Sequence, residues 1–345
     1  YFVILIYPFS YICIMYPRAS LLLLCVFTVI FCKNTKGQNS FSEKSFKSFR
    51  FTPTSLDSAV NTTTINRSRE KWLIGTNVVA YAGTLTALSV MWYANYPRSG
   101  FHFFNDDNEW MQVDKAGHMY SAYLISHASS EMWRWAGASR KTRIWVGGLS
   151  GLAYQSIIEV LDGFSAEYGF SPGDYTANIL GSAAFISQEL LWDEQRIKIK
   201  FSTYAKRYKD PGLEQRANKI YGESLAERFL KDYNMQNYWL SANIQSLFHS
   251  KTWPAWLNIA VGYGADGMFG ANGNTATDKT GNIIFDRQDI KRFRQWYLSP
   301  DLAFTKIKTR KKGIKVLLFV LDSFKFPAPA LEFSNGKFKG HWLYF

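Results

Sequence analysis

EVLDGFSAEYGFSPGDYTANILG, residues 159–181, joins two apolar, helix-like segments and carries four acidic side chains in 23 positions. These four are Glu159, Asp162, Glu167 and Asp174. The chain as a whole is basic, with a net charge of +13. Such a concentration of carboxylates therefore indicates a polar site between the two segments. Because the linking stretch is short and contains glycine, we expect the flanking helices to pack antiparallel, with their polar ends facing each other.

Apolar, helix-like segments succeed one another on both sides of this stretch. They cover residues 72–92, 114–136, 141–161 and 173–192. Small residues within them, as in GGLSG (147–151) and GSAAF (181–185), allow close approach of helix backbones. This pattern is typical of helices in membranes and also of tight soluble bundles. We predict a mostly α fold, built on a compact four-helix, membrane-associated bundle over residues 69–195.

The first segment, residues 72–92, contains no charged residue in 21 positions. At about 1.5 Å per residue it would extend about 31 Å, which is enough to cross the hydrocarbon core of a bilayer. A buried helix of a bundle would have the same composition, so both interpretations stay open. The aromatic-rich residues 91–110 that follow suit either an interfacial belt or a packed loop.

After the last apolar helix the sequence becomes charged and then aromatic. Residues 196–237 are basic and amphipathic, and they predict a helical hairpin packed on the rim of the bundle. Residues 238–345 predict a small antiparallel β region. Within it, segments 256–270 and 294–308 alternate in hydrophobicity and indicate one hairpin with a long polar loop. Asn335-Gly336 marks the turn of a second hairpin.

The N-terminal region has the pattern of a signal peptide, which we assign to residues 1–37, with 1–14 as upstream read-through. Arg18 supplies the basic region, and the leucine-rich residues 21–31 supply the apolar core. Cleavage is expected before Gln38. We therefore expect an exported protein of the cell envelope, periplasmic and membrane-associated.

The cysteines bear on both anchoring and redox chemistry. Val29–Phe31 stand directly before Cys32, where a lipoprotein signal would have small residues, so we expect no lipid at Cys32. Cys13 and Cys25 also lie in the segment that cleavage would remove. Disulfides and thiol catalysis are then excluded from the mature chain. Residues 38–68 are rich in Ser, Thr and Asn and predict a flexible segment.

Basic residues gather in two runs along the second half of the chain. The later run stands directly ahead of VLLFVLDSF (316–324) and consists of Lys306, Lys308, Arg310, Lys311, Lys312 and Lys315. An exported protein rarely meets nucleic acid, so we expect anionic membrane lipid head groups as the partner and no nucleic acid. A solvated basic face is the alternative explanation.

Three of the predicted helices each carry a pair of polar residues three or four positions apart. This spacing puts both members of a pair on one face of the helix. The pairs are Asp114 with His118, Glu159 with Asp162, and Asp174 with Asn178. We predict that these six side chains converge, with Lys115 nearby, on one cavity at one end of the bundle. Buried carboxylates need such a cationic partner, either a side chain or a bound cation.

Each of these residues also has a structural explanation. Ser171 to Asp174 has the pattern of a capping box, with proline at the first helical position. Asp114 could cap its own helix, and His118 could be a hydrogen-bonded core histidine. Caps do not account for carboxylates and amides on facing apolar helices, so the full set favours a site.

The motifs DKAGH (114–118), E..DG (159–163) and S..D...N..G (171–181) resemble those of the uncharacterised YfiM-like predicted periplasmic lipoproteins. They are more distantly similar to the VanZ-like membrane proteins, which share the order of these motifs. The resemblance covers about residues 70–195 and implies a bacterial envelope location without an established activity. The chain departs from the pattern in its Cys32 context and in its added C-terminal region.

Three functions fit these observations. The first, which we favour, is an uncharacterised envelope protein whose polar site binds a lipid-linked or glycan ligand. The second is an acid/base or metal-dependent hydrolase or transferase acting on an envelope substrate. In it a divalent metal could be held by His118, Glu159, Asp162 and Asp174. The third is a purely structural envelope component. The sequence contains no nucleophile elbow, P-loop or HExxH zinc motif.

Overall fold

The computed structural model describes residues 65–88, 97–278 and 280–345, which fall into two compact units. The smaller unit contains helix α3 (Arg67–Leu88) and residues Trp133–Arg140, joined by a hydrogen bond from the Asn66 amide to the Ala136 carbonyl. The larger unit contains Tyr96–Met132 and Lys141–Phe345, and with them every candidate site residue. The predicted signal peptide, Cys32 and nearly all of the segment 38–68 lie outside the described residues.

Three long helices form the helical layer of the larger unit. They are α4 (Val113–Trp135), α6 (Gly148–Asp162) and α7 (Pro172–Trp192). The 3₁₀ turn η2 (Glu109–Gln112) leads into α4, and α5 (Arg140–Thr142) with the π-helical turn η3 (Arg143–Gly147) leads into α6. The predicted helices at 114–136 and 173–192 are confirmed to within one residue at each end by α4 and α7. The predicted helix at 141–161 corresponds to the continuous helical run Arg140–Asp162, which consists of α5, η3 and α6.

Glycines set how closely these three helices approach one another. A Cβ atom added at Gly151 of α6 would lie 2.0 Å from the carbonyl oxygen of Ala122 in α4. A Cβ atom at Gly181 of α7 would lie 2.2 Å from the carbonyl oxygen of Met119. No side chain fits at such distances, so both helices contact the backbone of α4 through bare glycine. The close approach predicted from the small residues is confirmed.

The second half of the chain is dominated by β-structure. Six strands form one antiparallel sheet in the order β1-β2-β3-β6-β7-β8, and β4 pairs with β5 in a separate hairpin. The strands are β1 (Ile197–Thr203), β2 (Gln236–Ala242), β3 (Leu257–Asp266), β4 (Thr275–Thr277), β5 (Ile283–Asp286), β6 (Phe293–Leu302), β7 (Ala328–Ser334) and β8 (Lys337–Tyr344).

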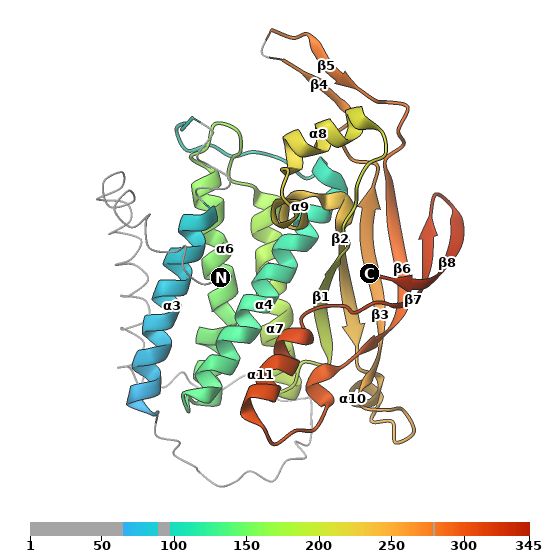
Figure 1. Cartoon of the computed structure of the whole chain (residues 1–345). Coiled ribbons are helices and arrows are strands. Elements are labelled where there is room, and N and C mark those ends of the chain that lie inside the picture. The colour runs from blue at the N-terminus through green and yellow to red at the C-terminus, as the bar shows by residue number, and fades with distance from the viewer. Residues whose placement is uncertain (1–64, 89–96, 279) are drawn as a thin grey trace, which may run out of the picture. The chain divides into compact units, whose positions relative to one another are not determined.

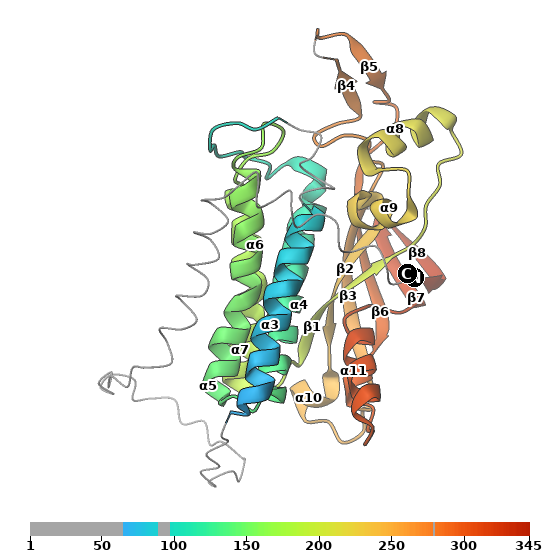
Figure 2. The ribbon, with the colours of Figure 1, turned by 60° about the vertical axis from the view of Figure 1, so that its left-hand side comes forward.

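The prediction of a mostly α fold built on a four-helix bundle is wrong. The larger unit is instead α+β, with a layer of three helices beside the first strands, β1 and β2, of a large sheet (Figure 1). Turning the molecule by 60° shows the helical and β layers side by side (Figure 2). Helix α3, expected as the fourth member of the bundle, belongs to the other unit.

Both predicted hairpins are present. β3 and β6 pair without a break from Leu257↔Leu302 to Asp266↔Phe293, and the long loop between them contains β4 and β5. β7 and β8 are joined by Asn335-Gly336, whose φ angles of 49° and 73° are those a two-residue hairpin turn requires. The sheet is larger than expected because β1 and β2 extend it to six strands.

Shorter helices connect the strands. They are α8 (Pro211–Tyr221), α9 (Leu225–Lys231), α10 (Ile244–Phe248) and α11 (Lys312–Leu321), with the 3₁₀ turns η4 (Tyr233–Met235) and η5 (Phe304–Lys306). The helical hairpin predicted over 196–237 is thus correct only for α8 and α9. Its first residues form β1, whose alternating Lys198 and Lys200 are turned inward and paired with acids rather than exposed.

The helical layer and the sheet share a core of aromatic and branched side chains. Tyr120 and Tyr123 of α4 meet Phe185 of α7 and Ile199 of β1. The ring of Tyr120 stacks on that of Phe201 with centroids 5.7 Å apart. This contact holds the N-terminal half of α4, and so the candidate site, in a fixed position on the first strands of the sheet.

One helical run in the described residues, Arg140–Asp162, is long and apolar enough to cross a membrane by length and composition alone. A core helix of a soluble protein passes the same test, and 44% of this window is buried inside the protein. The run predicted at 72–92 is described only as far as Leu88, where α3 ends.

Candidate functional site: carboxylates around Lys115 and His118

The first turns of α4 and α7 and the last turn of α6 meet at one end of the helical layer. On α4, Lys115 and His118 lie three residues apart and so project from the same side of the helix. α6 contributes Glu159, and α7 contributes Asp174 and Asn178. The side chains of these five residues contact one another and form the centre of the cluster.

Lys115 is surrounded by three carboxylates. Its Nζ lies 2.5 Å from Asp106 Oδ1, 3.2 Å from Asp114 Oδ2 and 2.9 Å from Asp174 Oδ1. Burial acts to lower the pKa of Lys115, but the charges of Asp114 and Asp174 outweigh it and raise that pKa above its usual value. The ammonium group is therefore a permanent positive charge at this end of the cluster.

His118 is the centre of the other half. Its Nδ1 lies 3.4 Å from Glu159 Oε1 and 3.2 Å from Asn178 Oδ1, and its Nε2 lies 3.8 Å from Asp174 Oδ2. The Gln155 amide, one helical turn before Glu159, approaches the same Nδ1 at 3.4 Å. Oxygen atoms thus lie near both ring nitrogens of His118, and the same oxygens could coordinate a bound cation.

The start of α7 explains why Asp174 is available to the cluster. Ser171 caps the helix, since its Oγ accepts a hydrogen bond from the Asp174 amide at 3.0 Å. In a complete capping box the acid at this position would bond back to the cap amide. Here Glu159 Oε2 of α6 accepts from the Ser171 amide at 3.3 Å instead. The Asp174 carboxylate contacts Lys115 and His118, so the predicted cap and the predicted site coexist.

The loop ahead of α4 brings Asp106 into the cluster. This loop pairs with the 163–170 turn through the bridges Arg98↔Ser165 and Phe103↔Phe170. Asp106 then accepts a hydrogen bond from Ser171 Oγ at 2.5 Å. Its pKa is lowered although burial raises it, because the hydrogen bonds from Lys115 and Ser171 outweigh burial.

Two backbone features surround the site. Trp110, Met111 and Gln112 have left-handed φ angles of 46°, 52° and 63° directly before α4 begins. For a residue other than glycine, this backbone conformation costs about 1 kcal/mol or more. At the start of α7, a Cβ atom on Gly173 would lie 2.2 Å from Asp107 Oδ1 and 3.0 Å from Lys115 Cε. Only glycine lets the helix end approach the lysine so closely.

Negative charge exceeds positive charge in the cluster. Four carboxylates (Asp106, Asp114, Glu159, Asp174) face one lysine and one histidine. Burial raises the pKa of Glu159 to about 9 and that of Asp114 to about 6, and the charge of Asp174 adds to both increases. Glu159 is 1% exposed, and its Oε1 makes no hydrogen bond within the described residues. The cluster therefore holds a proton on Glu159 at neutral pH unless another positive charge replaces it.

The structure brings together six of the seven predicted site residues. The exception is Asp162, which ends α6 and is half-buried. Its charge adds to the pKa rise of Glu159, but it is not among the donor groups that lie within 4.8 Å of one another. Those groups are His118, Glu159 and Asp174 in one set, and Asp106, Asp114 and Asp174 in the other.

Sequence reasoning missed Asp106 and Gln155. Asp106 lies in a loop, FNDDNEW, where an acidic residue has no periodic neighbour to give it a direction. Gln155 could have been predicted, because it precedes Glu159 by four residues and therefore lies on the same face of α6.

A family model described as predicted periplasmic lipoprotein (DUF2279) matches residues 100–188. This range contains α4, α6, all but the last four residues of α7, and every member of the cluster, and it ends before β1. The match supports an uncharacterised periplasmic protein family, while the finer likeness to YfiM-like and VanZ-like proteins stays a prediction. No curated protein and no solved structure matched the chain.

The predicted location is confirmed: the chain is an exported protein of the cell envelope. The lipoprotein description of the matching family is consistent with membrane association. The expectation of an unmodified Cys32 concerns residues outside the described ranges and stays a prediction.

Proposed function

We propose that this periplasmic envelope protein binds a divalent metal ion between His118, Glu159 and Asp174. The main support is the buried Glu159 Oε1, which makes no hydrogen bond within the described residues and lies 3.4 Å from His118 Nδ1. A buried carboxylate oxygen without a donor is costly, and a cation at this position would remove the cost. One imidazole nitrogen with carboxylate oxygens is a donor set that suits zinc, manganese or iron.

The other carboxylate set is a poorer candidate. Asp106, Asp114 and Asp174 already have the Lys115 ammonium within 3.2 Å of an oxygen of each. A divalent ion placed among them would be repelled by this charge. Lys115 therefore acts as an internal cation for one half of the cluster and leaves the His118 half for an external one.

The cluster is better suited to an ion than to a large ligand, because the carboxylates of Asp114, Glu159 and Asp174 are buried. A lipid-linked or glycan ligand would reach the ion only from the solvent side of His118, whose side chain is 22% exposed. Oxygen atoms of such a ligand could complete the coordination there.

An acid/base hydrolase or transferase is the second candidate, and the raised pKa of Glu159 favours it. A carboxyl group with a pKa of about 9 keeps its proton at neutral pH and can donate it to a leaving group. His118, whose Nδ1 lies 3.4 Å away, would take a proton from the attacking water or hydroxyl group and pass it to Glu159, which restores the acid. This role needs no ion, so measurement of bound metal distinguishes the two candidates.

The first test is metal analysis of the full chain. After chelation and reloading with zinc, manganese or magnesium, we expect one equivalent of zinc or manganese to remain after gel filtration. Glu159→Gln should reduce this to background, because the amide keeps the shape but cannot supply a negative oxygen. Calorimetric titration would give the affinity of each protein.

His341 provides a matched control. It forms a similar pair with Glu332, with 2.6 Å between Nε2 and Oε2, on β8 and β7. His341→Gln should keep the full equivalent of metal, whereas His118→Gln should lose it. A wild-type chain that retains no divalent ion under any loading condition would contradict the proposal and leave the acid/base candidate.

A further inference from the structure

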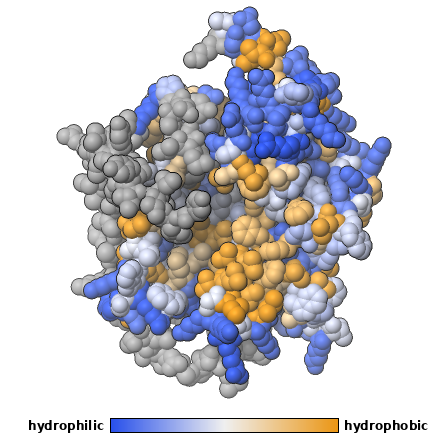
Figure 3. All heavy atoms as spheres, in the orientation of Figure 1, coloured by the Kyte–Doolittle hydropathy of each residue, from blue (hydrophilic) through white to orange (hydrophobic). Residues whose placement is uncertain are grey.

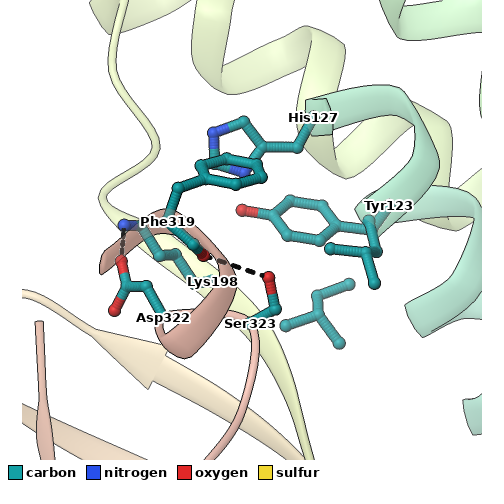
Figure 4. A pocket seen from close by; sticks show the side chains of 8 residues that line it. Tyr123, His127, Lys198, Phe319, Asp322 and Ser323 are labelled. Carbon is teal, nitrogen blue, oxygen red and sulfur yellow. Dashed lines mark hydrogen bonds and ion pairs between the residues drawn. The ribbon is translucent and has the colours of Figure 1, made fainter. Parts of the chain in front are cut away.

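Helix α11 is attached to the larger unit along one side. The Phe319 ring lies edge-on to that of His127 in α4, with centroids 4.8 Å apart (Figure 4). At the end of the helix Asp322 pairs with Lys198 of β1, and the Ser323 carbonyl accepts a hydrogen bond from Tyr120 at 3.2 Å. These contacts fix the position of α11 against α4 and the edge of the sheet.

The other side of α11 is apolar and exposed. Val316, Leu317 and Val320 are 63%, 55% and 47% exposed, and Ile314 is 40% exposed. In the space-filling view the position of α11 coincides with a continuous hydrophobic area (Figure 3). Soluble proteins rarely leave several large aliphatic side chains exposed on one short helix unless the surface binds something apolar.

Unpaired positive charges adjoin this apolar face. Lys306 is bonded to Glu194 and Ser246 and so is already neutralised. The following basic residues are exposed and take part in no ion pair within the described ranges: Lys308, Arg310, Lys311, Lys312 and Lys315. The first four immediately precede or begin α11. Five free cations beside an aliphatic face form an amphipathic surface, which we name the α11 surface (residues 308–320).

A pocket of about 440 Å³ opens next to the start of this surface. Trp256, Leu302 and Ile307 supply apolar lining, and Lys306 and Lys308 also line the pocket. Trp256 is half-exposed, and tryptophan is enriched where proteins meet the boundary between lipid chains and head groups. The pocket thus extends the same combination of apolar and cationic groups beyond the helix.

We propose that the α11 surface docks onto an anionic phospholipid bilayer, with its aliphatic side chains at the acyl boundary and its basic residues on lipid phosphates. Charge complementarity decides the occupant, because an apolar protein partner or a second copy of this basic chain would leave the five cations unpaired. Each basic side chain near an anionic surface strengthens binding about fivefold. This contact is independent of the metal site and of any anchor at the N-terminus.

An environment-sensitive fluorophore on α11 tests the proposal in the full chain. The three native cysteines are replaced by serine and the dye is attached to Val316→Cys. With vesicles of phosphatidylglycerol and phosphatidylcholine we expect a blue shift and quenching by a lipid-borne quencher. Pure phosphatidylcholine vesicles should give little change. The pair Lys311→Glu with Lys312→Glu should weaken partitioning at least about 25-fold, since two attractive charges are lost.

Ile283→Cys carries the dye in the control protein. This residue is 68% exposed on β5, so a chain held at vesicles only by its N-terminus would give equal signals at both positions. The proposal is overturned if position 316 stays in water, or if its shift is the same on neutral vesicles and after charge reversal. A shift without vesicles that grows with protein concentration would indicate self-association and would equally overturn it. Circular dichroism confirms that each variant is folded.

Discussion

At the residue scale, Glu159 combines burial with one carboxylate oxygen, Oε1, that makes no hydrogen bond within the described residues. Its pKa rises to about 9 in the folded chain, while an unfolded chain would titrate near about 4.3. Between these pH values the folded state holds a proton that the unfolded state has released. Folding stability must therefore fall as pH rises across this window. A buried residue that lowers stability at neutral pH is more easily explained by function than by structure.

Replacing Glu159 by glutamine should therefore stabilise the metal-free protein. At pH 8 we expect a gain on the order of 2–4 kcal/mol, because the neutral amide needs no proton. The gain should vanish near pH 4, where the carboxyl is protonated in both states. Urea unfolding at both pH values in the presence of a chelator measures the difference.

Glu332 is the control for this experiment. Hydrogen bonds from Ser334, Gln295 and His341 outweigh burial and lower its pKa, so its charged form contributes to stability. Glu332→Gln should therefore destabilise the protein at pH 8. If Glu159→Gln also destabilised it there, the carboxylate would be charged and structurally satisfied, and the metal proposal would lose its support.

The residues of the site could be predicted from the sequence only where they lie on helices. Asp114, His118, Glu159, Asp174 and Asn178 repeat at helical spacing, so their direction follows from the period of the helix. The same rule included Asp162, although the helix ends there and its carboxylate is not among the donor groups that lie within 4.8 Å of one another. Asp106 could not be predicted, because a loop residue has no period and its position depends on the tertiary pairing of two distant turns.

At the element scale, the geometry of the site depends on helices that touch through glycine. Gly151→Ala would place a methyl group 2.0 Å from the Ala122 carbonyl oxygen, so α6 must move away from α4. Overpacking of this kind costs about 1–3 kcal/mol or more. We also expect a weaker metal affinity, because Glu159 lies two turns further along α6. Thermal unfolding and calorimetric metal titration measure the two effects.

Gly75→Ala is the matched control, since a Cβ atom there meets nothing within 4 Å. In the helix α3 this change should be neutral or stabilise by up to about 1 kcal/mol, because alanine is the better helix former. Equal destabilisation by both substitutions would mean that close packing at Gly151 is not the cause.

The β elements show where sequence patterns stop being informative. β3, β6, β7 and β8 have turn residues or alternating apolar residues that identify them without tertiary information. β1 (Ile197–Thr203) also alternates, but its polar positions Lys198 and Lys200 are not exposed: Lys200 is buried and Lys198 is partly buried. From the sequence alone, a lysine in a strand is predicted to be exposed. The acidic residues that pair with Lys198 and Lys200 could not be identified in advance, because they lie more than 100 residues away along the chain.

At the scale of the whole larger unit, one buried ion-pair network links the sheet to α11. Lys200 Nζ lies 2.7 Å from Asp301 Oδ2 of β6 and 3.0 Å from Asp322 Oδ1 at the end of α11. Asp322 also pairs with Lys198 and accepts a hydrogen bond from the Phe304 amide at 3.0 Å. Strand β1, the turn η5 and the end of α11 thus share the Asp322 carboxylate, and Lys200 extends the network to β6 through Asp301. The position of the α11 surface depends on this network.

The Asp322→Asn variant should destabilise the protein by about 3–5 kcal/mol, because it leaves Lys198 without its paired charge in a buried position. Burial alone would raise the pKa of Asp322, but Lys198 and Lys200 outweigh it and hold that pKa well below its usual range. The network therefore stabilises the fold at all pH values above about 3.9, the unfolded value, and its contribution is lost as pH falls below it. Acid titration followed by circular dichroism should show a steep loss of folded structure below about pH 4 in the wild type and a shallower loss in the variant.

Asp289→Asn is the control. It breaks an exposed pair with Arg287 and should leave the unfolding temperature and the acid profile unchanged. If Asp322→Asn were equally silent, the network would not be what holds α11 in place, and α11 would depend on its other contacts, such as those of Phe319 with His127 and of Ser323 with Tyr120.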